Sequence, residues 1–298
     1  MAMQRFISSR IGVGTGLFLG RTIPSSLGYR LTAIAAKFIS RRKSTSIVQA
    51  VMQNQAVVRG LPYPGGELEF ASEEVFQHAG RCFIDLYQNL GNPEKLISFV
   101  KIDAMAEKLI EYSDDQSFGA FIVAPHLSNF DLCLLAMAYR GLKAMVLSYG
   151  QPRGGYKIQN KIRSQTGLEI TPVEGKTHDQ AVSKLINGGL VITAVDRPIR
   201  KKAHMLNFFD RPSPLPTGHI RMSIQAGVPI IVASASLEQD GKYAIVLSDP
   251  IEMKTTRDRN SDIKANGERV LNEIETRIKT HPGQWLMYYP VWSNDTHQ

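Results

Sequence analysis

The stretch FIVAPHLSNFDLCLLA, residues 121–136, decides the fold class and points to a functional site. It begins with a short apolar run rich in strand-forming residues, which predicts a buried strand over residues 120–124. His126 follows almost at once, and Asp131 lies at the start of an apolar segment that predicts a helix over residues 129–140. A strand that leads through a polar turn into a helix is typical of the first half of a βαβ unit.

The same alternation of strands and helices continues toward the C-terminus. Further strands are predicted over residues 144–148, 169–173, 190–195, 229–234 and 243–247. Helices are predicted over residues 72–90, 157–166, 179–187, 217–226 and 263–280, with a capping box formed by Thr177 and Gln180. This order predicts an α/β fold, with a largely parallel or mixed central sheet flanked by helices.

The composition is that of a globular chain with one large core. Of its 298 residues, 43% are hydrophobic and 21% are charged. The two cysteines, Cys82 and Cys133, have neither metal-ligand spacing nor a partner cluster, so we expect no metal site and no disulfide framework. We predict two parts: a basic, apolar, helical segment over residues 1–66 and an α/β domain over residues 67–298.

The charge of the N-terminal segment is one-sided. No Asp or Glu precedes Glu67, whereas nine Lys and Arg do. Such a segment fits an anionic membrane surface, a soluble helical appendage with a basic face, or an organelle transit peptide. Arg10, Arg21 and Arg30 divide its apolar runs, which argues against a membrane-spanning helix and a signal peptide. Nucleic-acid binding is not expected, because the segment has no aromatic interleaving and no recognised motif.

Polar residues follow two of the predicted strands directly. His126 and Asp131 lie beyond the first, and Asp196 follows the strand over residues 190–195. Ligands of open α/β sheets bind outside the carboxyl ends of the strands, so the three side chains form a candidate site. His126 could act as a general base, with Asp131 accepting a hydrogen bond from its second ring nitrogen. From spacing alone, a helix-start carboxylate and an ordinary loop histidine remain the alternative.

Four blocks of the chain together resemble a known family. HLSNFDLCLLA, which begins at His126, resembles the His-x4-Asp/Glu box of the lysophospholipid acyltransferase superfamily, most closely in its lipid A late (lauroyl and myristoyl) acyltransferase branch. Three later blocks resemble that branch in the same order: AVSKLINGGLVITAVDRP, HMLNFFDRPSPLPTGHIRMSIQAGVPIIVAS and IETRIKTHPGQWLMYYPVW. The resemblance covers most of residues 70–292, and ordered blocks are more specific than the His box alone.

The chain departs from the pattern of this branch at four positions, which are Ser128 for Gly, Asp131 for Glu, Pro198 for the second acid of Asp-x-Asp, and Asp210 for Gly. The first two changes are conservative. The loss of the second acid, together with the gain of Arg197, suggests an acceptor other than the lipid A disaccharide.

The resemblance implies an O-acyltransferase that moves a fatty acyl group from acyl-CoA or acyl carrier protein to a hydroxyl of a membrane lipid or glycolipid. It implies His126 as general base oriented by Asp131, with Asp196 either positioning the acceptor or supporting the histidine, and with no cofactor and no metal. Substrate-binding residues would be Asn129, Arg163, Arg197, Thr217 and Gly218. The resemblance also implies a peripheral protein on the cytoplasmic face of the inner or plasma membrane.

Alternatives remain for the basic residues and for the activity. Arg163 could belong to a solvated basic helix face, and Arg197 with the basic residues 200–202 to a surface charge run. A serine hydrolase is the first rival activity, although no Gly-x-Ser-x-Gly elbow occurs. A nucleotide-binding enzyme lacks the required glycine spacing, and a lipid-binding protein without chemistry would have no need of the His126 and Asp131 pair.

Overall fold

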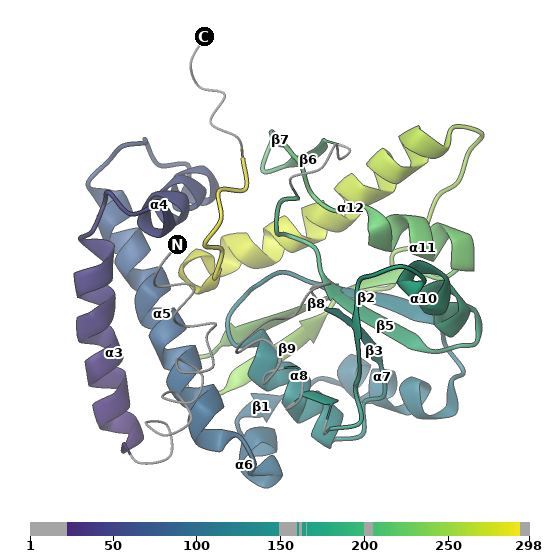
Figure 1. Ribbon diagram of the computed structural model, residues 1–298, viewed down its shortest axis with the longest axis horizontal. Coiled ribbons are helices and arrows are strands. Elements are labelled where there is room, and N and C mark those ends of the chain that lie inside the picture. Colours follow the sequence, from purple (N-terminus) through teal and green to yellow (C-terminus); the bar gives the residue numbers. More distant parts are fainter. Residues whose placement is uncertain (1–22, 149–159, 161–162, 165, 200–204, 293–298) are drawn as a thin grey trace.

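The computed structural model describes residues 23–148, 160, 163–164, 166–199 and 205–292. At its centre is a seven-stranded mixed sheet with the strand order β1-β9-β8-β2-β5-β3-β4 (Figure 1). The strands are β1 (Val100–Lys101), β2 (Ala120–Ala124), β3 (Met145–Ser148), β4 (Glu169–Pro172), β5 (Leu190–Ala194), β8 (Ile230–Leu237) and β9 (Tyr243–Leu247). Neighbouring strands run parallel except for β8 and β9, which are antiparallel. The predicted α/β fold with a largely parallel sheet is confirmed.

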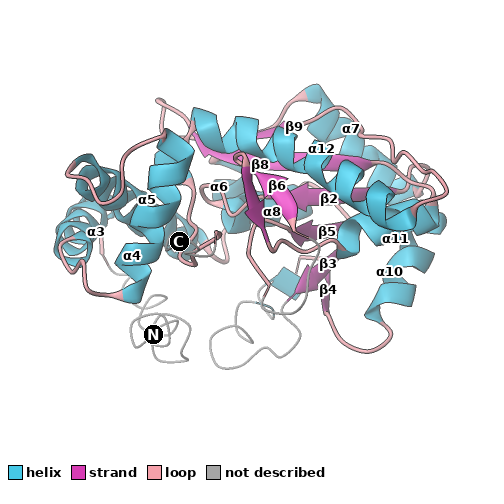
Figure 2. Ribbon diagram, turned by 90° about the horizontal axis from the view of Figure 1, so that it is seen from above, coloured by secondary structure: helices cyan, strands magenta, loops and turns pink. Residues whose placement is uncertain are grey.

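Helices cover both faces of this sheet, as Figure 2 shows from above. The side chains of β2 alternate between the two faces, because successive strand residues point in opposite directions. Ile122 packs in the cluster with α6 (Pro93–Ser98), α7 (Ala104–Asp115) and α8 (Phe130–Tyr139). Phe121 and Val123 pack in the cluster with α10 (Thr177–Ile186), α11 (Gly218–Ala226) and α12 (Arg259–Thr280). A strand buried on both faces accounts for the continuous apolar run that predicted it.

A two-stranded hairpin, β6 (Leu206–Phe208) and β7 (Arg211–Ser213), packs against α12. Both turn residues, Phe209 and Asp210, have positive φ, at 53° and 56°. The Phe209 amide donates to Glu275 Oε1 on α12 at 2.6 Å, which helps to hold the turn in place.

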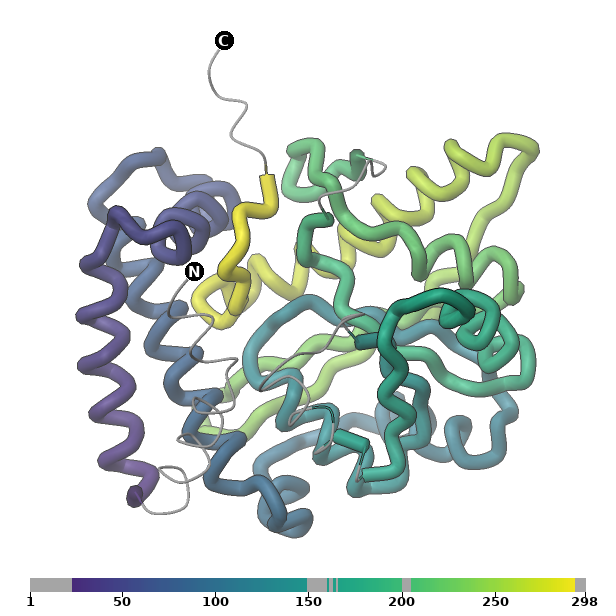
Figure 3. The backbone as a smooth tube through the Cα atoms, viewed as in Figure 1, coloured from purple at the N-terminus to yellow at the C-terminus, as the bar shows by residue number. Residues whose placement is uncertain are grey.

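The N-terminal helices α3 (Ser25–Ser40), α4 (Ser46–Arg59) and α5 (Glu67–Asn89) form a third cluster beside the sheet. The buried Asn54 joins α4 to the C-terminal segment, because its amide donates to the carbonyls of Met287 and Tyr289 and accepts from the Val291 amide. Figure 3 shows this purple-to-blue N-terminal part and the yellow C-terminal part side by side. The division at residue 66 stays a prediction. Within the described ranges, no helix has the length and apolarity needed to cross a membrane.

The predicted strands and helices agree with the structure to within a few residues, except where their residues are not described. The helix predicted over residues 157–166 lies mostly outside the described residues. The predicted capping box is wrong, because Lys176 occupies the N-cap of α10 and the Thr177 hydroxyl donates to the carbonyls of Pro172 and Glu174. The sequence analysis did not predict α6, α7, β1 and the β6–β7 hairpin.

Candidate active site

His126 and Asp196 lie beside each other at the carboxyl edge of the sheet. β2 and β5 pair in parallel with Ala124 opposite Ala194, so the residues two positions beyond each strand end come together. His126 Nδ1 lies 2.6 Å from Asp196 Oδ1, and the His126 backbone amide donates to Asp196 Oδ2 at 2.8 Å. The Asp196 side chain is fully buried, whereas a quarter of the His126 side chain is exposed. The carboxylate therefore orients the imidazole from inside the protein.

Trp285 completes the surroundings of Asp196. Its indole Nε1 donates to Asp196 Oδ2 at 2.8 Å, which gives the buried carboxylate a third donor. Two backbone bonds hold the polypeptide around His126 to the same segment: the Leu286 amide donates to the His126 carbonyl at 2.8 Å, and the Ser128 amide donates to the Gln284 carbonyl at 2.8 Å. The sequence analysis quoted the stretch that contains Trp285 but assigned no role to it.

The electrostatics favour the charged forms of both partners. Burial alone lowers the pKa of His126, but the charge and hydrogen bond of Asp196 outweigh burial and raise it, with Arg197 opposing and Asp131 adding a smaller effect. Burial would raise the pKa of Asp196, yet the His126 charge and the hydrogen bonds from His126 and Trp285 lower it. Asp196 is thus held as a carboxylate that stabilises the imidazolium. The bond at Nδ1 leaves Nε2 as the ring nitrogen that can accept a proton.

The predicted hydrogen bond between His126 and Asp131 is wrong. Asp131 lies in the first turn of α8, as expected, but it forms an ion pair with Arg163. Both of these side chains are mostly buried, at 14% exposed for Arg163 and 22% for Asp131. Arg163 also donates to Asn160 Oδ1 at 3.1 Å, so it does not belong to a solvated basic face.

Comparison with known proteins assigns the chain to a family. A model of the bacterial lipid A biosynthesis acyltransferase family matches residues 6–294. The chain belongs to this family. It is therefore an acyltransferase of the class that acts on lipids or glycolipids, as the four resembling blocks predicted.

Two curated relatives carry the same printed name. A phosphatidylinositol mannoside acyltransferase of Mycolicibacterium smegmatis is 20% identical over 292 residues, which are 96% of this chain and 91% of the relative. A phosphatidylinositol mannoside acyltransferase of Mycobacterium tuberculosis is 21% identical over 181 residues, which are 59% of this chain and 55% of that protein.

Arg197 follows Asp196 directly and lies near enough to His126 to oppose its protonation. Its guanidinium stacks on the Tyr289 ring, 3.8 Å from the ring centroid, and its charge acts on His126. Among the described residues, no carboxylate forms an ion pair with it. The basic residues 200–202 lie outside the described residues.

The other predicted substrate-binding residues, Asn129, Thr217 and Gly218, make no hydrogen bond to His126 among the described residues. The Asn129 amide donates to the Cys82 carbonyl at 3.0 Å inside the protein, so Asn129 occupies the N-cap of α8 without capping it through its side chain. Thr217 is the N-cap of α11 and Gly218 is its first residue. No hydrogen bond or ion pair between described residues joins Thr217 or Gly218 to His126.

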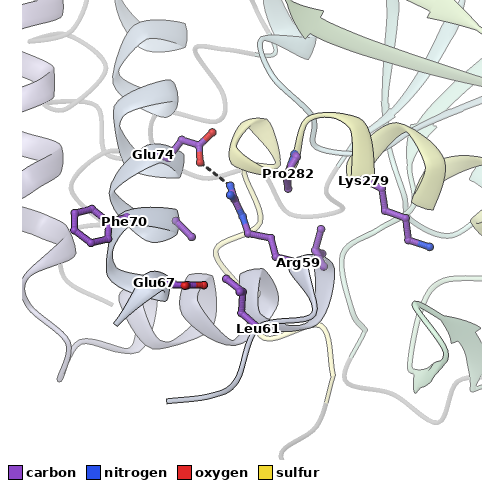
Figure 4. A pocket seen from close by; sticks show the side chains of 9 residues that line it. Arg59, Leu61, Glu67, Phe70, Glu74, Lys279 and Pro282 are labelled. Carbon is purple, nitrogen blue, oxygen red and sulfur yellow. Dashed lines mark hydrogen bonds and ion pairs between the residues drawn. The ribbon is translucent and has the colours of Figure 1, made fainter. Parts of the chain in front are cut away.

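A surface cavity of about 480 Å³ lies away from these residues, between α4, α5 and the end of α12 (Figure 4). Phe70 and Leu61 line it, and the Arg59–Glu74 ion pair crosses it. None of the candidate catalytic residues lines this cavity. In the described parts of the chain, no group of three or more His, Cys, Asp or Glu side chains could hold a metal ion.

Proposed function

We propose that the protein transfers a fatty acyl group from an acyl thioester to a hydroxyl of a membrane lipid or glycolipid, with His126 as the general base. The observation that carries this proposal is the hydrogen bond from His126 Nδ1 to the buried Asp196 carboxylate. This bond leaves Nε2 of a partly exposed imidazole available for the acceptor. The activity of the family supplies the reaction class.

The proposed step balances with these two residues. The acceptor hydroxyl gives its proton to His126 Nε2 as its oxygen attacks the thioester carbonyl carbon. The tetrahedral intermediate then collapses, the carbon–sulfur bond breaks, and the proton passes from the imidazolium to the thiolate that leaves. Asp196 stabilises the imidazolium between these events. Acyl-CoA and acyl carrier protein both present the required thioester.

Arg197 is the residue we assign to an anionic group of a substrate. It bears a guanidinium stacked on Tyr289 and has no carboxylate partner among the described residues. Guanidinium groups bind phosphate through paired donors. The names of the relatives support a phosphorylated mannolipid as the acceptor, whereas a lipid A precursor would be the acceptor named by the family.

The surroundings of Ser128, the serine two residues after His126, argue against a serine hydrolase. Ser128 Oγ lies 2.9 Å from His78 Nε2, which resembles a nucleophile with its base. However, Ser128 is 1% exposed, and burial, with Arg81 and His281, lowers the pKa of His78 to about 4. A base needs a pKa near the working pH and a substrate needs access, so this pair meets neither condition.

Mass spectrometry tests the proposed reaction. Purified protein is incubated with palmitoyl-CoA or palmitoyl carrier protein and with a phosphatidylinositol mannoside or a lipid A precursor. We expect an acylated lipid, stoichiometric free thiol, and a protein of unchanged mass during turnover. Free fatty acid in place of acylated lipid, or an acylated protein that accumulates in the steady state, would contradict direct transfer.

The outer face of α3 supports a further part of the proposal, which is peripheral binding to an anionic membrane. Leu27, Leu31, Ile34 and Phe38 recur at helical spacing and are 46%, 48%, 68% and 60% exposed. The opposite face is buried against α5. Exposed Arg30, Lys37, Arg41 and Arg42 accompany this apolar face. An apolar face with basic neighbours suits the headgroup region of an anionic bilayer, where each basic residue adds about 1 kcal/mol. We place this membrane at the cytoplasmic side, where both thioester donors occur.

A matched pair of substitutions tests this membrane face. Ile34→Asp introduces a negative charge into the α3 face, and Ile186→Asp does the same at the end of α10, where Ile186 is 62% exposed. We expect Ile34→Asp to lose most of its sedimentation with phosphatidylglycerol vesicles at low salt, while Ile186→Asp sediments like the parent protein. Equal sedimentation of the two variants would refute the proposed membrane face. Acyl transfer to a detergent-dispersed acceptor checks separately that the catalytic site is intact.

A further inference from the structure

We propose that His78 is a positioning residue for the active-site loop, residues 125–129, and that it acts through Ser128. The inference rests on the proposed acyl transfer, because its role is to hold His126 for that reaction. His78 lies on α5, far from the loop in sequence, and its Nε2 meets Ser128 Oγ at 2.9 Å in the interior. A link of this kind holds the loop from inside the protein.

Ser128 has a backbone conformation that a non-glycine residue adopts only with support. Its φ is 51°, in the left-handed region, where a side chain crowds the backbone. Residues persist there when their surroundings compensate for the strain. The hydroxyl of Ser128 is buried, and its hydrogen bond to His78 satisfies it. Without His78, Ser128 would keep the strain, and its hydroxyl would be left with only the weakly hydrogen-bonding thiol of Cys82.

His78 is suited to act as a fixed neutral partner. It is buried, its pKa is lowered to about 4 by burial, with smaller contributions from Arg81 and His281, and its Nε2 also lies 3.3 Å from Cys82 Sγ. The ring therefore stays uncharged at neutral pH. The next residue of the loop is held to the same helix, since Asn129 donates to the Cys82 carbonyl.

The conformation of Ser128 determines the position of His126 through the main chain. The Ser128 amide donates to the Gln284 carbonyl, and the Leu286 amide donates to the His126 carbonyl, on either side of the Leu127–Trp285 bridge. If Ser128 leaves the left-handed region, its amide turns away and this bridge loosens. The two hydrogen bonds from His126 to Asp196 then lose their geometry.

Three variants measure this effect. His78→Phe removes the partner and should lower kcat about tenfold or more, with KM nearly unchanged. Ser128→Gly adopts the same φ without a hydroxyl and should stay within about threefold of the parent rate. In the double variant, Ser128→Gly should make the His78→Phe change nearly neutral, because the strain and the buried hydroxyl are both gone. An equal loss from His78→Phe in both backgrounds would overturn the inference.

A second substitution at the same position separates positioning from other roles. Ser128→Ala retains the strain but loses the hydroxyl, so it should be impaired like His78→Phe, and it replaces that variant if His78→Phe does not fold. Should Ser128 act as a nucleophile, Ser128→Gly and Ser128→Ala would both be inactive, and the inference would be wrong.

The placement of the loop can also be measured without substrate, through the pKa of His126. In an NMR titration, the pKa of His126 should fall in His78→Phe and return toward the parent value in the double variant, because the bond to Asp196 weakens and is restored. An unchanged His126 titration in His78→Phe would contradict the inference. A parent protein that gives the expected titrations but no acyl transfer would refute the proposed function and leave the loop placement intact.

Discussion

Replacing Asp196 by asparagine removes a buried charge while it preserves the size of the side chain. The carboxylate lies 2.6 Å from His126 Nδ1 and accepts two further hydrogen bonds, from the His126 amide and from Trp285. A carboxylate in such contact raises a histidine pKa by about 1 to 3 units, or about 1.4 to 4 kcal/mol, which corresponds to a 10- to 1000-fold fall in kcat.

The tautomer adds to this loss. The asparagine oxygen can accept from the backbone amide and the indole, which places its NH₂ group against His126 Nδ1. The proton of the neutral imidazole must then move to Nε2, the atom that should receive the proton of the acceptor. The corresponding change in the serine protease triad lowers kcat about 10⁴-fold. We therefore expect Asp196→Asn to lower kcat by a factor between about 10 and about 10⁴.

The assay is kcat/KM for acyl transfer between pH 5 and pH 9. In the parent protein the pKa of His126 is raised, so activity should rise with pH through a value above 6.5. Burial dominates once the charge is gone, so in Asp196→Asn the acidic limb should move to lower pH while the maximum falls. A variant with kcat within about threefold of the parent and an unmoved acidic limb would refute the role of Asp196.

Three other predictions concern the surroundings of the site and the fold. Arg163→Ala leaves the partly buried Asp131 unpaired and should lower kcat/KM about tenfold, with recovery when Asp131→Asn is added; additive losses would contradict the coupling. Gly188→Ala should lower the unfolding free energy by about 2 kcal/mol more than Gly227→Ala in urea, because both glycines have positive φ but only at Gly188 would Cβ meet a backbone oxygen, 1.8 Å away. Burial lowers the pKa of His219 to about 3, so below pH 6.5 the unfolded chain binds a proton that the folded chain does not. The unfolding free energy should therefore decrease as the pH is lowered below 6.5, by up to about 1.4 kcal/mol per pH unit. His219→Phe should reduce that slope in urea titrations between pH 7 and pH 5, and an identical slope would contradict it.

The sequence predicted the ends of β2 and β5 to within one residue, because β2 is buried on both faces and β5 begins with two buried apolar residues, and continuous apolar runs indicate such burial. Their parallel pairing then predicted that His126 and Asp196 would lie at one edge of the sheet. The sequence could not decide which of the two carboxylates binds His126 Nδ1, because the contact depends on the register of two strands about 70 residues apart. Asp131 is nearer in sequence, yet its position on α8 directs it to Arg163.

Other features lacked a local sequence signal. The β6–β7 turn has no glycine or asparagine at Phe209 and Asp210, although positive φ at both positions usually selects those residues. Trp285 reaches Asp196 across 89 positions of the chain, and His78 reaches Ser128 across 50. Contacts of this kind arise from packing, so no spacing pattern could have indicated them.

The rate of ester formation by His126→Ala tests the central claim most directly. His178, an exposed histidine on α10 whose ring contacts Gln225, provides a matched control. With one thioester donor and one lipid acceptor, His126→Ala should transfer the acyl group about 10² to 10⁴ times more slowly than the parent protein, and His178→Ala should match the parent. A folded His126→Ala protein that forms the ester at the parent rate would contradict general-base catalysis by His126.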